Sequence, residues 1–211
     1  MKDFTNYKKY VIYYNKYKDV IYVNINKIDT YLKENLSKKR YEHSLLVAKE
    51  AKSLAKIYHV DEEKAYLAGL IHDIAKELSE DENNYWIKKG NLADDLKKEN
   101  YKKIRHADIG ALIAKEKYNL DNDICNAIKY HTIGNKNMDT LAKIIYIADK
   151  IGRKEIPKEL IPIKDLVKKD LNAALIYFIE KQNKNLISKN ITPHKNTEEL
   201  LQTLKKQNKN S

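Results

Sequence analysis

The chain has 211 residues, enough for one domain with a substantial hydrophobic core. Its net charge of +11 favours an anionic partner, although the abundance of Lys, Asn, Ile and Tyr also fits a codon bias towards A and T. The sequence contains no uncharged segment long enough for a membrane helix, its first residues do not resemble a secretory signal, and one cysteine excludes an internal disulfide. We therefore expect a cytoplasmic protein that does not enter the membrane.

Residues 1–28 differ in character from the rest of the chain. Two short β-prone runs, residues 10–14 and 20–25, flank residues 15–19, which can form a turn. An isolated hairpin is only marginally stable, so it would have to pack on the domain or on a partner. A hairpin and a flexible extension both remain open, and we treat residues 1–28 as an extension and residues 29–211 as the main domain.

From residue 29 onward the pattern predicts helices almost throughout, and hence an all-α bundle. Ser37 can cap a helix that runs to about Tyr58, and Asp61 can cap the next one. The second helix carries the pair His72-Asp73 among apolar residues, and we expect this pair in the middle of the helix. A buried histidine and carboxylate need partners, and the simplest partner is a metal ion.

The second half of the chain continues this pattern after a polar segment. Residues 79–104 are expected to be irregular, with Trp86 as an anchor and Gly90 as a break. Helices are then predicted at about 107–117, from 121 or 122 to about 131, and at 140–151, where Asp139 is the cap. Two or three more follow between residues 163 and 207, the last capped by Asn196 or Thr197.

Each helix of the middle section brings a metal-ligand residue to an apolar or terminal position. These residues are His43, His72, Asp73, His106, His131 and Asp149. Imidazole suits iron, zinc, manganese or cobalt better than magnesium, so the set predicts a site for one or two transition metals. Two metals that share a carboxylate and a hydroxide form an arrangement used for attack on phosphorus.

The order of these residues resembles that of the HD-domain metal-dependent phosphohydrolases. The finer motifs resemble the YqeK-type branch of symmetrical diadenosine tetraphosphate hydrolases. These motifs are Arg-Tyr-Glu-His at 40–43, Leu-Ile-His-Asp-Ile-Ala-Lys at 70–76, Ala-Ile-Lys-Tyr-His-Thr-Ile-Gly at 127–134 and Ile-Ala-Asp-Lys-Ile at 147–151. The resemblance covers about residues 36–190 and implies an HD-type helical fold.

The resemblance also implies a ligand set and a reaction. One metal would be held by His43, His72, Asp73 and Asp149, and the second by Asp73, His106 and His131. The implied cofactor is a di-iron site, with manganese, cobalt or zinc as alternatives. The implied reaction is hydrolysis of diadenosine tetraphosphate at its central phosphoanhydride, through water activated by two metals, to give two ADP.

Further residues are candidates for contact with the substrate. Lys76, Arg40 and Arg153 can bind phosphates, and Lys76 joins the bridging Asp73 as a candidate catalytic residue. Thr132 and Gly134 can offer a hydroxyl and backbone N–H groups. Each has an ordinary alternative as a surface residue or a helix end.

The sequence departs from the family pattern at two places. A Glu-Pro pair that usually precedes Gly-Arg is missing between Ile151 and Gly152, which affects the placing of Arg153. The segment Ile-Arg-His-Ala-Asp at 104–108 matches the pattern only loosely.

Three alternatives to this function remain. The nearest is an HD-domain nucleotidase or nucleoside triphosphate phosphohydrolase. A basic nucleic-acid-binding protein is disfavoured because the lysines are scattered and the chain has no RNA-binding signature. An HD fold kept only for interactions is disfavoured by the intact ligand set. The expected partner is therefore a dinucleoside polyphosphate or a nucleotide, and a homodimer is left open.

Overall fold

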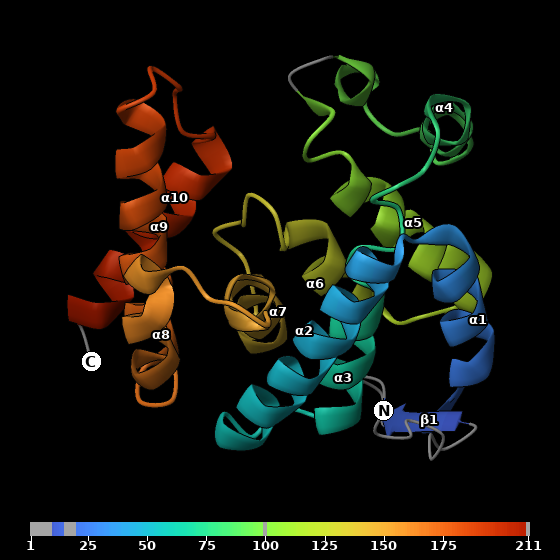
Figure 1. The fold of residues 1–211 in the computed structure, drawn as a ribbon, viewed down its shortest axis with the longest axis horizontal. Coiled ribbons are helices and arrows are strands. Elements are labelled where there is room, and N and C mark those ends of the chain that lie inside the picture. Colours follow the sequence, from blue (N-terminus) through green and yellow to red (C-terminus); the bar gives the residue numbers. More distant parts are fainter. Residues whose placement is uncertain (1–9, 15–19, 99–100, 210–211) are drawn as a thin grey trace.

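Helices make up most of the described chain, which comprises residues 10–14, 20–98 and 101–209 of a computed structural model (Figure 1). The elements in chain order are β1 Tyr10–Tyr14, β2 Val20–Asn24, α1 Ile25–Asn35, α2 Lys38–Ile57, α3 Glu62–Ile71, α4 Glu80–Lys89, η1 Asp94–Lys97, α5 His106–Tyr118, α6 Asn122–Tyr130, α7 Thr140–Ile151, η3 Lys158–Leu160, α8 Ile161–Leu166, α9 Leu171–Ile187 and α10 Lys195–Lys209. The prediction of an all-α bundle is confirmed. Within this part of the chain, no helix is both long enough and apolar enough to cross a membrane.

The predicted helix caps define where several of these helices begin. The Ser37 hydroxyl accepts a hydrogen bond from the Arg40 backbone N–H, and Asp61 caps α3 in the same way. Asp121 caps α6, and Asp139 accepts from the Ala142 N–H at 2.7 Å at the start of α7. These side chains satisfy backbone donors that have no partner inside the helix, so they set the first turns of the helices around the site.

The polar segment after residue 78 is more regular than its composition predicts. Residues 80–89 form α4, so the prediction of an irregular segment is wrong there. The reason is a capping box, in which Ser79 and Glu82 bond each other's backbone N–H groups. Trp86 is buried and Gly90 ends the helix, as predicted.

The helix that leads to the His-Asp pair ends earlier than predicted. Helix α3 stops at Ile71, and residues 72–77 form consecutive turns, so the pair does not lie in the middle of a helix. Ile74 N–H donates to the Ile71 carbonyl and Lys76 N–H donates to the Asp73 carbonyl, at 3.0 and 2.9 Å. These tight i to i+3 bonds replace the helical pattern.

Two glycines allow helix α2 to approach its neighbours closely. A Cβ at Gly69 of α3 would lie 2.8 Å from the Ala48 Cα, and a Cβ at Gly152 after α7 would lie 2.9 Å from the Val47 Cα. Both distances are shorter than real Cβ contacts, so the two backbones pack directly on α2. This packing holds α2, α3 and α7 together, and these helices carry or directly precede four of the six predicted ligands.

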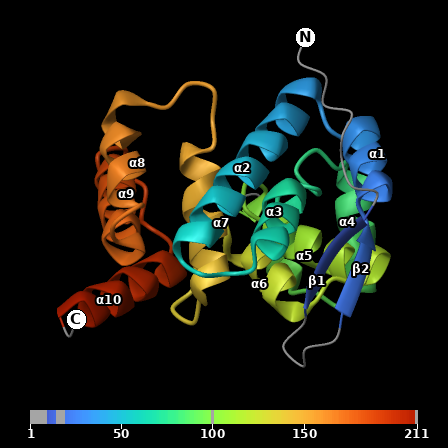
Figure 2. The ribbon, with the colours of Figure 1, turned by 90° about the horizontal axis from the view of Figure 1, so that it is seen from below.

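The N-terminal hairpin exists and packs on the helices. Strands β1 and β2 are antiparallel, with Tyr13 opposite Ile21, and β1 contacts α3 (Figure 2). The Tyr13 side chain is only 1% exposed. Helix α1 begins at Ile25, so it runs across residue 28, while the predicted turn at 15–19 lies outside the described residues. The division of the chain at residue 28 stays a prediction.

The C-terminal helices lie on one side of α7, opposite the hairpin (Figure 2). Helix α9 packs against α7, α8 and α10. Helix α10 begins at Lys195, so the predicted caps Asn196 and Thr197 lie inside the helix and that prediction is wrong. Thr197 instead donates its hydroxyl proton to the Ile133 carbonyl at 2.7 Å, and this bond ties α10 to the loop that follows α6.

Candidate metal centre

The structure brings all six predicted ligands to one place. They come from α2, the turn after α3, the first residue of α5, the residue after α6, and the last turns of α7. Three overlapping sets have donor atoms within 4.8 Å of one another: His43, His72 and Asp73; His72, His131 and Asp149; and Asp73, His106 and His131. The second metal set implied by the family resemblance is one of these three.

His72 lies at the centre and is fully buried. Its Nδ1 lies 2.7 Å from the Gly69 carbonyl oxygen, which can only accept, so Nδ1–H donates. Its Nε2 is buried and has no hydrogen-bond partner within the described residues. That atom lies 3.3 Å from Asp73 Oδ2 and 3.6 Å from Asp149 Oδ1. This arrangement is typical of a metal-binding histidine, in which a hydrogen bond to one ring nitrogen orients the ring and the other nitrogen faces the metal site.

His131 is oriented in the same way. Its Nδ1–H donates to the Ile128 carbonyl at 2.6 Å, and its Nε2 lies 3.1 Å from His106 Nε2. Burial lowers the pKa of His106 to about 3 and also lowers the pKa of His131. Both rings are therefore neutral at physiological pH, and each has a lone pair to offer.

Asp73 faces both halves of the cluster. Its Oδ1 lies 3.2 Å from His106 Nε2 and 3.5 Å from His131 Nε2. Its Oδ2 lies near His72 and 2.7 Å from Arg40 Nη1. Burial alone would raise the pKa of this carboxyl, but the imidazoles, His72 first among them, hold it well below its usual range. An ionised carboxylate with one oxygen on each side is suited to bridging two cations.

Asp149 closes the cluster from α7. Its Oδ1 lies 2.9 Å from His43 Nε2, and its Oδ2 lies 2.6 Å from Lys150 Nζ. Burial raises the pKa of Asp149, but Lys150 and His43 outweigh this effect and hold it well below its usual range. Lys150 was not predicted from the sequence. The available signal was a lysine directly after the aspartate, in the mostly apolar second half of the helix.

Three predicted phosphate contacts border the cluster. Arg40 reaches Asp73, and Lys76 Nζ lies 3.1 Å from His106 Nε2. Arg153 is exposed, and its Nε donates to the Asp149 carbonyl oxygen at 3.2 Å. The structure therefore places positive charge around the donors, as phosphate binding requires, while the role of each side chain stays a prediction.

The two residues predicted in the loop after α6 have structural explanations. Gly134 has a φ of +72°, and its N–H donates to the Tyr130 carbonyl at 2.9 Å. A Cβ there would lie 2.4 Å from Leu200 Cδ2. Gly134 thus closes the turn that follows α6 and, lacking a Cβ, makes room for Leu200 of α10. Thr132 follows His131 directly in the turn, and substrate contact by either residue stays a prediction.

The residues present fit a divalent metal. The set contains four imidazoles and two ionised carboxylates, which are donors that suit transition metals. The buried Nε2 of His72 has no other partner in the described chain and would be costly to leave unsatisfied. A cation between His72, Asp73 and Asp149 would satisfy that nitrogen and compensate both carboxylates.

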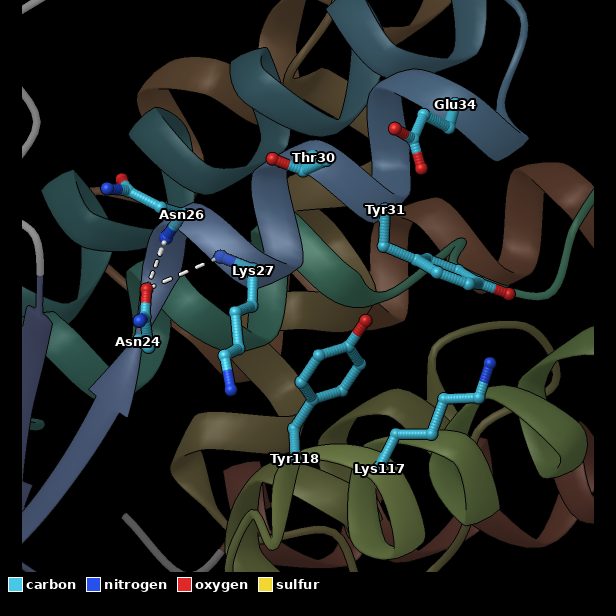
Figure 3. Close-up of a pocket in the computed structure, with 8 residues that line it drawn as sticks. All are labelled: Asn24, Asn26, Lys27, Thr30, Tyr31, Glu34, Lys117 and Tyr118. Carbon is cyan, nitrogen blue, oxygen red and sulfur yellow. Dashed lines mark hydrogen bonds between the residues drawn. The ribbon is translucent and has the colours of Figure 1, made fainter.

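A groove that includes none of these donors is drawn in Figure 3. It has a volume of about 620 Å³ and is lined by residues of α1 and the end of α5, among them Lys27, Tyr31 and Tyr118. Helix α5 begins at His106 and ends at Tyr118, so at a rise of 1.5 Å per residue its 13 residues separate the two places by about 18 Å. None of the six donors lines this groove.

Comparison with known proteins agrees with this geometry. The HD domain family model matches residues 40–154. A protein from Bacillus subtilis named "Bis(5'-nucleosyl)-tetraphosphatase, symmetrical" is 34% identical over 160 residues, 75% of this chain and 86% of that protein. A relative of the same name from Halalkalibacterium halodurans is 33% identical over 160 residues, 75% of this chain and 85% of its own length.

A solved structure is similar over nearly its whole length. The protein from Clostridium acetobutylicum, described as a predicted HD superfamily hydrolase involved in NAD metabolism, is 38% identical with a TM-score of 0.80. The match covers 87% of this chain and 97% of that one. The chain belongs to the HD-domain family, and the resemblance inferred from its motifs is confirmed.

Proposed function

We propose that this chain hydrolyses diadenosine tetraphosphate and related dinucleoside tetraphosphates at the central phosphoanhydride, giving two nucleoside diphosphates. The observation that carries the proposal is the buried cluster of four histidines and two aspartates, bordered by Arg40, Lys76 and Arg153. The names of the relatives from B. subtilis and H. halodurans support the substrate and the symmetrical cleavage.

The six donors would hold two divalent metals, which we propose to be iron, with manganese, cobalt or zinc as alternatives. When bound, such metals polarise phosphate oxygens and lower the pKa of a water molecule. Asp73 would serve both, because its two oxygens face different histidines. His72 and His131 are held in the required tautomer by the carbonyl groups of Gly69 and Ile128.

The cationic side chains would bind and orient the polyphosphate. A tetraphosphate chain carries several negative charges, and a planar guanidinium can bind two oxygens of one phosphate at once. Arg40 and Lys76 lie beside the donors, while Arg153 lies at the end of α7 in contact with solvent. Their positions suit phosphates on either side of the one attacked.

The experiment is a product analysis with metal-loaded protein. Diadenosine tetraphosphate is incubated with the full chain, and early products are resolved by anion exchange. ADP as the only early product supports the proposal. AMP with ATP would show asymmetric cleavage, and rapid turnover of a mononucleotide without cleavage of diadenosine tetraphosphate would favour an HD-domain nucleotidase. The cytoplasmic location expected from the sequence and a homodimer stay predictions.

A further inference from the structure

A groove of about 670 Å³ lies between η3 and α9, away from the groove of Figure 3. The residues that matter here are Leu160 of η3 and Phe178, Lys181, Gln182 and Lys184 of α9. Ligand sites for small molecules commonly have volumes of about 300–1,000 Å³, so this groove has room for a nucleoside with its phosphates. Three lysines and one glutamate line it, which makes it positively charged.

One wall residue of the groove, Phe178, is linked to the metal centre through Lys150, which does not itself line the groove. Lys150 Nζ lies 2.6 Å from Asp149 Oδ2 and 5.8 Å from the centroid of the Phe178 ring. Tyr146 of α7 packs edge-on against the same ring, with centroids 5.9 Å apart. One ammonium group therefore separates a ligand carboxylate from the wall of the groove. The groove of Figure 3 has no such connection, because it lies at the far end of α5.

The wall combines the groups that a nucleoside needs. The half-buried Leu160 and the exposed edge of Phe178, which is 7% exposed, supply apolar surface for a base. The Oε1 atom of Gln182 is buried and has no hydrogen-bond partner among the described residues. An unpaired buried acceptor is costly, and the amino group of a nucleobase would satisfy it. Lys181 and Lys184 are exposed at the rim, where they can attract phosphates.

We propose that this groove binds the second nucleoside of the dinucleoside tetraphosphate, with its base against Phe178 and Leu160 and an amino group of the base facing Gln182. The proposal rests on the proposed function, since it assigns one half of that substrate to the groove. It also explains how the cleavage position is chosen. With one nucleoside held in this groove, only a fixed number of phosphates fits between it and the cluster.

Photolabelling tests the location directly. The full-length, metal-loaded protein is irradiated with 8-azidoadenosine diphosphate, and labelled peptides are identified by mass spectrometry. We expect label in residues 178–189, and we expect excess ADP to prevent it. Label confined to the segments that form the groove of Figure 3, or to segments that line neither groove, would overturn the proposal.

Kinetics with two substrates test the role of the side chains. Gln182→Met and Lys184→Met should each raise the KM for diadenosine tetraphosphate by about tenfold, with kcat within about twofold. Adenosine tetraphosphate has one nucleoside, which can bind on the other side of the cluster, so its KM should change by less than about threefold. Lys27→Met, in the groove of Figure 3, is the matched control and should change neither.

The two tests separate this inference from the proposed function. Equal KM changes for both substrates, or no change in either, would overturn the groove as the site of the second nucleoside. Normal cleavage to ADP without label on α9 would leave the proposed function standing and reject the groove. Label on α9 in a protein that does not cleave diadenosine tetraphosphate would reject the proposed function and still identify a nucleoside diphosphate site.

Discussion

Arg40 Nη1 lies 2.7 Å from Asp73 Oδ2, so a cation from the first turn of α2 touches the carboxylate at the centre of the cluster. The other oxygen of that carboxylate faces His106 and His131. The arginine side chain is 32% exposed, whereas the aspartate is almost fully buried. Arg40 thus reaches from solvent to the donors, which is the position expected of a phosphate contact beside a metal centre.

Replacing Arg40 with lysine separates charge from geometry. Arg40→Lys keeps the positive charge but loses the planar fork that binds two phosphate oxygens. We expect the KM for diadenosine tetraphosphate to rise about tenfold, equivalent to about 1.4 kcal/mol, with the metal content unchanged. Steady-state kinetics and elemental analysis of the same preparation check this. Loss of metal in the variant would show that Arg40 chiefly holds Asp73 in place.

Removing the metal should lower stability as well as activity. The donors come from five separate segments, so a bound cation joins parts of the chain that are far apart in sequence. A ligand at 100 times its dissociation constant stabilises a protein by about 2.7 kcal/mol. For a chain of this size we therefore expect removal of the metal by a chelator to lower the Tm by about 5–10 °C. Thermal unfolding with and without chelator measures the shift.

His72→Ala provides the matched variant for that measurement. It removes the central donor and should abolish both metal binding and the effect of chelator on Tm. His59→Asn is the control, because His59 is exposed and has a φ of +54°, a conformation that asparagine tolerates. A wild-type protein that keeps full activity in chelator would contradict the metal centre.

The parts of this fold that the sequence predicts well depend on local interactions. Ser37, Asp61, Asp121 and Asp139 each bond a backbone N–H two or three residues further along the chain, so their effect is visible in a short window. The strand limits at residues 10–14 and 20–24 also follow from local composition. The ligand order is recognisable because the family motifs keep each donor type at its place in the chain.

The errors have different causes. Helix α3 ends at Ile71 without a glycine or proline at its end. There the ring Nδ1–H of His72 donates a hydrogen bond to the Gly69 carbonyl. The position of Lys150 between Asp149 and Phe178 depends on the packing of α9 against α7, which residues adjacent in sequence do not reveal. The irregular conformation predicted for residues 80–89 is a different error, because the capping box of α4 was present in the sequence.

The close packing of α3 on α2 is a direct target for mutation. In Gly69→Ala the added Cβ would lie 2.8 Å from the Ala48 Cα, so the two helices must separate. Overpacking of this kind costs about 1–3 kcal/mol, and here it also moves His43 of α2 away from His72. We expect lower Tm and lower metal occupancy together, measured by thermal unfolding and elemental analysis.

Gly110→Ala is a suitable comparison for that variant. Its Cβ would lie 3.3 Å from the Ile128 Cγ2 methyl, a side-chain contact that needs a shift of only a few tenths of an ångström, and alanine favours the helix by about 1 kcal/mol. We expect a clearly smaller loss of stability than in Gly69→Ala. Equal losses in the two variants would mean that the backbone contact at Ala48 is not what limits packing.

Gly134→Ala tests whether the loop after α6 contacts substrate. The φ of +72° and the 2.4 Å approach to Leu200 make any side chain unfavourable, so stability should fall by about 1–3 kcal/mol. The Gly134 N–H already donates to the Tyr130 carbonyl, so the KM for diadenosine tetraphosphate should stay within about threefold of wild type. A large rise in KM with little loss of stability would instead support the predicted substrate contact.

Tyr13 of strand β1 covers a charged cluster on the main domain. The Tyr13 ring lies 5.3 Å from Lys64 Nζ, which is bonded to Asp121 at 2.7 Å and to Asp123 at 2.9 Å. The Asp121 N–H donates to the Tyr13 hydroxyl oxygen at 3.4 Å. Burial raises the pKa of Tyr13, so its hydroxyl stays protonated. The tyrosine therefore shields an ion pair that would otherwise face solvent.

Deletion of residues 1–23 should destabilise the protein without affecting its metal centre. The deletion leaves Asn24 in place, so α1 keeps its cap, and it removes none of the six donors. Loss of a buried aromatic side chain costs about 3 kcal/mol, which predicts a fall in Tm of about 6–12 °C. Tyr13→Ala in the full chain should reproduce most of this fall. We check the prediction by thermal unfolding, by metal analysis and by kcat/KM measured at 20 °C below the new Tm. A truncated protein that folds but has lost its metal would contradict it. That result would place the hairpin within the catalytic domain and move the boundary away from residue 28.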